Sequence, residues 1–273
     1  MLDYTHPKGE NKLMNQRQLQ KEWQKLNKAE EKFLKNNLPQ REDGWKNKVK
    51  TYVPNQLENT LQAAFCKAFS LIFEKGTTII EKTYDREKLT QEYQIQEYAA
   101  ELTGKPGKVK MFTRSARTGN LINTAISTAE GAGMGLLGLG LPDIPVFLSL
   151  LLKSIYEIAL HYGYSYDSAN EQIFIMKIIE NALLHDTALL ENNEALNDWI
   201  EKPETFSIPK TEQIQKASDA LAREMLYLKF IQGIPVVGML GGISDVIYQK
   251  KIKDYAMLKY QRRFLLEHLQ TEP

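Results

Sequence analysis

Asp143 and Asp245 are the residues whose type and position most invite chemistry. Each follows a glycine-rich, uncharged run and directly precedes a long stretch with helical periodicity. If the two carboxylates met in a dry site, one pKa would rise and proton or cation handling would become possible. A helix cap is the simpler role, because a carboxylate there accepts hydrogen bonds from free backbone N–H groups at the positive helix end. We expect two caps rather than a catalytic pair.

The glycines before Asp143 invite a nucleotide-binding interpretation. They stand at positions 131, 133, 135, 138 and 140. A Rossmann fingerprint requires a preceding strand and a βαβ unit, and a P-loop ends in Gly-Lys followed by Ser or Thr. Neither context is present, and no lysine stands between Lys110 and Lys153. We expect close helix packing at these glycines and no bound cofactor.

The histidines and the single cysteine add no second candidate. His6, His161, His185 and His268 are far apart, and no two have the His-x₃-His spacing of a metal site. Cys66 lies in an apolar run, where a buried small hydrophobic side chain is the expected role. The sequence therefore predicts no catalytic residue and no metal-ligand set.

The composition fits a folded protein in a reducing compartment. The chain has 273 residues, 42% hydrophobic and 25% charged, and its one cysteine excludes an internal disulfide. The N-terminus lacks the basic start and apolar core of a secretory signal. The net charge is +1, but residues 1–110 and 229–273 are net basic, whereas residues 153–228 are net acidic. We expect a cytoplasmic protein.

Helical periodicity accounts for almost the whole chain. Apolar residues recur at i, i+3, i+4 and i+7, and no run alternates with period two, so the predicted class is all-α. Residues 1–15 are polar and predicted to be loose, and residues 16–273 form one domain. Gly163 should end one helix, and Asp167 or Ser168 should cap the next. The expected helices span 16–34, 56–74, 86–102, 110–132, 169–190 and 212–231. Two more restart at residues 141–145 and near Asp245, and they reach about His161 and Leu269.

Two glycine-rich runs with few or no charged residues organise these helices. Residues 118–152 carry charge only at Glu130 and Asp143, and residues 230–244 carry none. Because small residues let helix backbones approach closely, we interpret each run as a glycine-broken helical hairpin within a helical bundle. A membrane span needs about 20 predominantly apolar residues, so we expect shallow contact with a bilayer rather than a crossing. The residues assigned to this structural role are Gly131, Gly135, Gly138, Gly140, Pro142, Gly238, Gly241 and Gly242.

Basic residues follow the second run. Lys250, Lys251, Arg262 and Arg263 lie on the C-terminal helix that begins there. Basic residues beside an apolar segment are typical of the cytoplasmic face of a membrane, so the expected partner is an anionic membrane surface or a membrane protein. The near-zero net charge and the absence of a recognition motif argue against nucleic acid.

The glycine run leads into Leu141-Pro-Asp-Ile-Pro145, which is followed by Ile155-x-x-Ile158-Ala159-x-x-Tyr162-Gly163-Tyr164 and then by Asp167 and Glu171. Elsewhere the chain has Trp23, Tyr52-Val-Pro54 and Arg262-Arg263-Phe264-Leu265. Together these motifs resemble the EcsC family. The resemblance covers most of the chain, although Gln172 stands where the family pattern has a basic residue, which puts an ion pair there in doubt. It implies a bacterial protein, and some members are encoded beside the subunits of an ABC exporter. The family's molecular function is not established, so the resemblance implies no catalytic or ligand residue.

Two functions follow as expectations. The first is a non-enzymatic accessory protein, peripheral at the inner face of the cell membrane, that acts beside an ABC-type transport or secretion system. The alternative is a soluble helical enzyme or a carrier of small molecules or lipid, with an internal site near Asp143 and Asp245.

Overall fold

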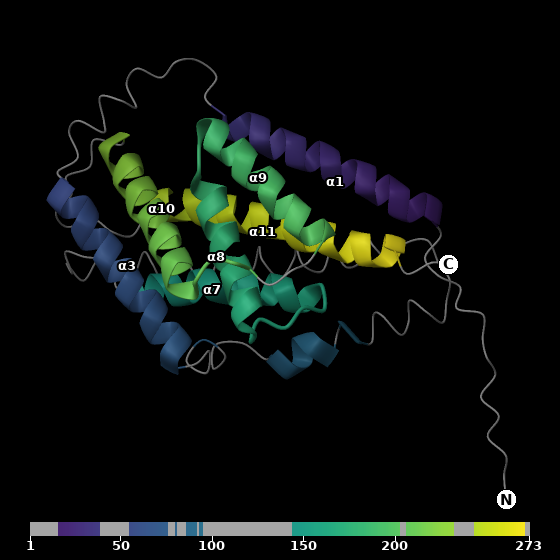
Figure 1. Cartoon of the computed structure of the whole chain (residues 1–273), viewed down its shortest axis with the longest axis horizontal. Coiled ribbons are helices and arrows are strands. Elements are labelled where there is room, and N and C mark those ends of the chain that lie inside the picture. Colours follow the sequence, from purple (N-terminus) through teal and green to yellow (C-terminus); the bar gives the residue numbers. More distant parts are fainter. Residues whose placement is uncertain are drawn as a thin grey trace, which may run out of the picture.

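The computed structural model describes residues 16–38, 55–75, 80, 86–91, 93–94, 144–202, 206–231 and 243–270. Helices make up the regular structure of these ranges, which contain no strand, so the predicted all-α class is confirmed there (Figure 1). The labelled elements are α1 (Gln16–Asn37), α3 (Asn55–Lys75), α7 (Ile144–His161), α8 (Ala169–Leu183), α9 (Asp186–Glu201), α10 (Lys210–Ile231) and α11 (Ile243–Gln270). The predicted helix 110–132 and the glycines of both hairpins lie outside the described residues, as do the loose residues 1–15.

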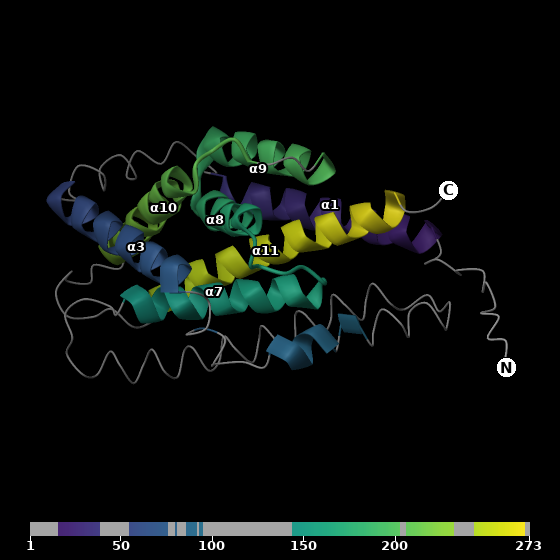
Figure 2. The same ribbon diagram turned by 60° about the horizontal axis from the view of Figure 1, so that its bottom comes forward.

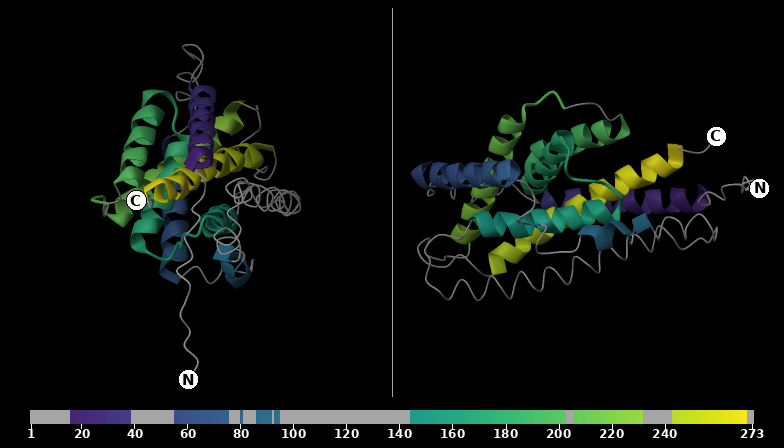
Figure 3. Two further views of the ribbon diagram at one scale, coloured as in Figure 1. Left: turned by 90° about the vertical axis from the view of Figure 1, so that its right-hand side faces the viewer. Right: turned by 90° about the horizontal axis from the view of Figure 1, so that it is seen from below.

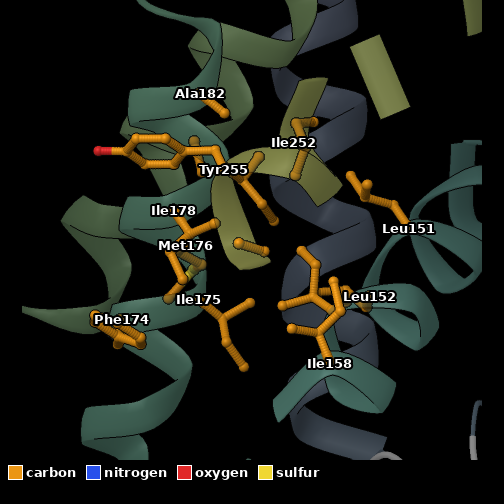
Figure 4. Close-up of a cluster of buried hydrophobic side chains, with 14 of the residues drawn as sticks. Leu151, Leu152, Ile158, Phe174, Ile175, Met176, Ile178, Ala182, Ile252 and Tyr255 are labelled. Atoms are coloured by element: carbon orange, nitrogen blue, oxygen red, sulfur yellow. The ribbon is translucent and has the colours of Figure 1, made fainter. Parts of the chain in front are cut away.

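Helix α11 is the element around which the others pack. It contacts α1, α7, α8, α9 and α10, while α3 lies against α7 and α10. Figure 2 shows α11 running between α1 on one side and α7 on the other. Its buried side chains include Tyr255, Tyr260 and Phe264. Figure 4 shows Tyr255 and Ile252 of α11 meeting apolar side chains of α7 and α8 in the core.

The predicted helix 169–190 is wrong as a single element. Leu184 and His185 are extended, so α8 ends at Leu183 and α9 begins at Asp186. The break lets α9 fold back on α8, and the Asn181 amide donates a hydrogen bond of 3.0 Å to the carbonyl of Asn192. Apolar spacing continues across the break, which is why periodicity alone predicted one helix.

The turn from α7 to α8 follows the predicted signals. Gly163 has φ +82, and the Tyr164 N–H donates to the carbonyl of Ala159 at 2.9 Å, which closes the end of α7. Ser168 is the cap of α8, because its side chain accepts the N–H of Glu171. Asp167 instead forms an ion pair with Arg86.

Gly163→Ala should lower the free energy of unfolding by about 1–3 kcal/mol, because a left-handed backbone at a residue other than glycine is strained. A Cβ there would also lie 2.4 Å from Cζ of Tyr93. Urea denaturation of Gly163→Ala, Tyr93→Ala and the double variant separates the two effects. If the Tyr93 clash contributes, the two costs will be less than additive. An unchanged midpoint for Gly163→Ala would contradict the prediction.

Candidate functional site

Several of the basic side chains of α11 point into the protein. Lys253, Lys259 and Arg262 are buried, and Arg263 is mostly covered. The expectation that Arg262 and Arg263 face a membrane or a partner is corrected: both guanidinium groups lie against buried carboxylates on other helices. An isolated buried charge is costly, so carboxylates from α1 and α8 compensate these cations inside the fold.

Glu30 of α1 is the centre of the larger buried cluster. Its residue exposure is 3%. One carboxylate oxygen accepts from Nζ of Lys259 at 2.7 Å and from the amide of Asn197 at 2.8 Å, and the other accepts from the Arg262 guanidinium at 2.7 and 3.2 Å. Four donors from α9 and α11 therefore converge on one carboxylate of α1.

The ammonium group of Lys259 also has hydrogen-bond acceptors for all of its donors. Besides Glu30, its ammonium donates to the side-chain oxygens of Asn193 and Asn197, each at 2.6 Å. These three bonds match the three donors of a lysine. The Tyr255 hydroxyl also donates to Asn193 at 2.9 Å. The cluster ties α1, α9 and α11 together.

Both charges persist at neutral pH. Burial alone raises the pKa of Glu30, but the attraction of Lys259 and Arg262 and its hydrogen bonds outweigh burial and bring the pKa to about 2. Burial lowers the pKa of Lys259 to about 8, against the attraction of Glu30. The pair is therefore an internal ion pair rather than a proton donor and acceptor poised for catalysis.

A second buried carboxylate, Glu171 of α8, meets α11 further along. It accepts from the Tyr260 hydroxyl and from the Arg263 guanidinium, each at 2.7 Å. The guanidinium also lies over the rings of Tyr164, at 4.1 Å, and Trp199, at 5.8 Å. Planar stacking of this kind favours arginine over lysine.

Gln172 takes part in a hydrogen bond rather than an ion pair. Its side-chain oxygen accepts from Nζ of Lys210, which also lies over the ring of Phe73 at 4.4 Å. The contact between α8 and α10 at Gln172 is thus a hydrogen bond from a charged lysine to a neutral amide.

A third group lies between α7 and α11. Glu157 and Lys253 are 6% and 4% exposed, and their charges attract each other. Burial raises the pKa of Glu157 to about 7, against the attraction of Lys153 and Lys253. Burial likewise lowers the pKa of Lys253 to about 8, against Glu157 and Asp254. Burial thus shifts the pKa values of both groups toward neutral pH.

Asp143 lies outside the described residues, so its role as a cap and any pairing with Asp245 stay predictions. Asp245 is the third residue of α11, so it lies in the first turn of the helix and not directly before the helix as expected. Pro142 and the glycines predicted to pack closely are also outside the described residues, so their roles stay predictions.

Two of the histidines, His185 and His268, form polar contacts. His185 lies 3.0 Å from a carboxylate oxygen of Glu224, and Nδ1 of His268 lies 2.8 Å from the carbonyl of Phe264. In the described ranges, no group of three or more histidine, cysteine, aspartate or glutamate side chains has a metal-binding arrangement.

The starts of α7 and α11 lie close together. Phe147, in the first turn of α7, and Tyr248, in the second turn of α11, have ring centroids 5.5 Å apart. Figure 3 shows α7 and α11 starting at the same end of the molecule. Residues 131–142 of the first run precede α7 in the chain, and residues 232–242 of the second run precede α11. Chain continuity therefore brings both runs to neighbouring helix starts.

The remaining basic candidates lie just beyond this junction. Lys250 is exposed and pairs with Asp254 on the same helix, and Lys251 is half-buried. Of the helices in the described ranges, none is both long and apolar enough to cross a bilayer.

Comparison with known proteins gives the family. The chain is 26% identical to Protein EcsC of Bacillus subtilis (strain 168) over 145 residues, which are 52% of this chain and 59% of that protein. It is 28% identical to the Uncharacterized protein YdbA of the same organism over 154 residues, 54% of this chain and 55% of YdbA. The chain thus spans little more than half the length of these relatives, and no solved structure matches it. The model of the EcsC protein family matches residues 20–265, so the chain belongs to that family.

Proposed function

We propose that this protein is a non-enzymatic accessory protein that associates peripherally with the inner face of the bacterial cell membrane. The glycine-rich, uncharged segments that precede α7 and α11, residues 131–142 and 232–242, make the apolar contact. The observation that carries the proposal is the contact of Phe147 with Tyr248, because it brings the helix starts that follow the two runs together. Two short apolar segments at one end of a protein give a larger apolar contact than either alone.

The buried charges favour a structural rather than a catalytic role for the described helices. Glu30 and Glu171 each accept hydrogen bonds from cations and polar groups of the chain itself. A catalytic acid or base must reach the proton that it transfers, and these carboxylates are covered. The proposed role beside an ABC-type transport or secretion system rests on the family resemblance alone.

Vesicle sedimentation tests the apolar contact. The parent protein should sediment with neutral phosphatidylcholine vesicles, and Leu137→Asp/Leu240→Asp should reduce the bound fraction at least about tenfold. One substitution falls in each run. Each adds a charge that opposes the transfer of its run into the bilayer by roughly 2–3 kcal/mol.

A charge-matched control is available on the surface. Leu71 on α3 and Leu190 on α9 are 37% and 39% exposed, so Leu71→Asp/Leu190→Asp adds the same two charges away from the runs. This control should bind as the parent does. Equal losses in both double variants, or no sedimentation of the parent, would rule out the proposed contact.

A further inference from the structure

The buried charge of helix α1 is acidic and its basic residues are exposed, whereas several basic residues of α11 are buried. Glu30 is buried, whereas every basic residue of the helix is exposed. These are Arg17, Lys21, Lys25, Lys28, Lys32 and Lys35, which we call the α1 stripe. Their spacings of four, four, three, four and three residues confine them to an arc of about 80° around the helix, over a length of roughly 27 Å.

Little acidic charge offsets the α1 stripe. Glu22 is half-buried and pairs with Lys25 at 2.6 Å. Glu31 is the one exposed acidic residue of the helix. No ion pair links Lys21, Lys28 or Lys32 to any other residue that the structure describes. The stripe is thus a concentrated positive surface on a chain whose net charge is only +1.

Buried contacts on the inner face of α1 keep the stripe on the outer, exposed face of the helix. Leu19 and Leu26 are 1% exposed, and Glu30 is held by Lys259 and Arg262. Rotating the helix to bury the stripe would withdraw this carboxylate from two buried cations. Figure 1 shows α1 along the periphery of the molecule, beside α9 and α11.

We propose that the α1 stripe is the surface through which the protein contacts anionic lipid headgroups. This inference rests on the proposed membrane association and names the lipid charge and the helix involved. A straight row of cations suits a planar array of negative charges, and each basic residue near such a surface strengthens binding about fivefold. The buried cations of α11 cannot serve in this way, because carboxylates of the chain already compensate them.

The surroundings of the stripe favour lipid over single-stranded nucleic acid. Proteins that bind single strands stack bases on exposed aromatic rings. The two aromatic residues of α1 face inward instead: Trp23 lies under the Arg262 guanidinium at 4.7 Å, and Phe33 lies against Tyr255 at 5.1 Å. No ring of α1 is therefore placed beside the stripe.

The test compares two triple variants of the full chain with equal changes in charge. Lys21→Gln/Lys28→Gln/Lys32→Gln removes three charges from the stripe and keeps helix propensity, because glutamine and lysine are similar in helices. Lys67→Gln/Lys202→Gln/Lys216→Gln removes three exposed charges elsewhere. Each is measured on phosphatidylcholine vesicles with and without phosphatidylglycerol.

Binding to neutral vesicles reports the apolar runs, and the gain on adding phosphatidylglycerol reports the stripe. In the parent that gain should fall as salt is raised. In the stripe variant that gain should be at least about tenfold smaller than in the parent. In the control triple variant the gain should be unchanged. An undiminished gain in the stripe variant, or equal losses in both triples, would overturn the inference while leaving neutral-vesicle binding intact. Duplex DNA or RNA bound more tightly than the anionic vesicles, and released by the stripe substitutions, would also overturn it.

Discussion

Glu30→Leu should lower the free energy of unfolding by about 3–5 kcal/mol, because it leaves the buried charges of Lys259 and Arg262 without their carboxylate. Lys259 is 0% exposed, so water cannot replace the lost acceptor without opening the fold. Urea denaturation near neutral pH measures the change. Glu31→Leu is the matched control, because Glu31 is the next residue of the same helix and is exposed. It should change stability by less than about 0.5 kcal/mol.

A compensating variant separates the charge effect from lost packing. Glu30→Leu/Lys259→Met/Arg262→Leu removes all three charges together, and replacing a buried ionic group by apolar side chains is often neutral or stabilising. We expect this triple variant to recover most of the loss. A triple variant as unstable as Glu30→Leu would show that shape, not unpaired charge, determines the cost.

The destabilisation caused by Glu30→Leu should depend on pH in a definite direction. The folded pKa of Glu30, about 2, lies below its ordinary value of 4.5. The stabilisation is therefore complete above about pH 4.5 and is lost as pH falls toward 2. The stability difference between the parent and Glu30→Leu should shrink over this window, and a constant difference down to pH 2 would contradict the assignment.

Helix positions followed from the sequence because apolar spacing records which face is buried. The predicted helix 56–74 is α3, Asn55–Lys75, and the predicted 212–231 is α10, Lys210–Ile231. Periodicity failed where a helix ends without a glycine or a proline, as at Leu184 and His185. A short extended break between two apolar helices leaves almost no local signal.

The buried ion pairs were missed because charged residues were assigned to the surface by type. A signal was present in the spacing. On α1 the buried stripe Leu19, Trp23, Leu26 and Phe33 has Glu30 at the one remaining stripe position. A charge within an apolar stripe is expected to have a buried partner.

The same rule applies to α11. Tyr248, Ile252 and Tyr255 continue at spacings of three and four to Lys259 and Arg262. Spacing therefore predicts that these two cations are internal. It cannot predict which carboxylate each one meets, because Glu30 is more than two hundred residues away in sequence and the pairing depends on how α1 packs.

Glu157→Leu/Lys253→Met should be at least as stable as the parent at neutral pH, with a gain of up to about 4 kcal/mol. Unlike Glu30, Glu157 has its pKa raised, to about 7, so burial outweighs the attraction of Lys153 and Lys253. The charged form is therefore disfavoured in the fold. The exposed pair Lys250–Asp254 on the same helix is the control, and Lys250→Met/Asp254→Leu should change stability by less than about 1 kcal/mol.

The sign of the pH effect separates this group from Glu30. Because the folded pKa of Glu157 lies above 4.5, the folded state binds the extra proton between about pH 4.5 and 7. Its contribution to stability is fully present below pH 4.5 and is lost as pH rises through 7. The advantage of the double variant should therefore grow from pH 5 to pH 7, whereas that of the Lys250–Asp254 control should not change. An advantage that falls over this range would mean that Glu157 is stabilised as a carboxylate and that its attraction to Lys253 outweighs its burial.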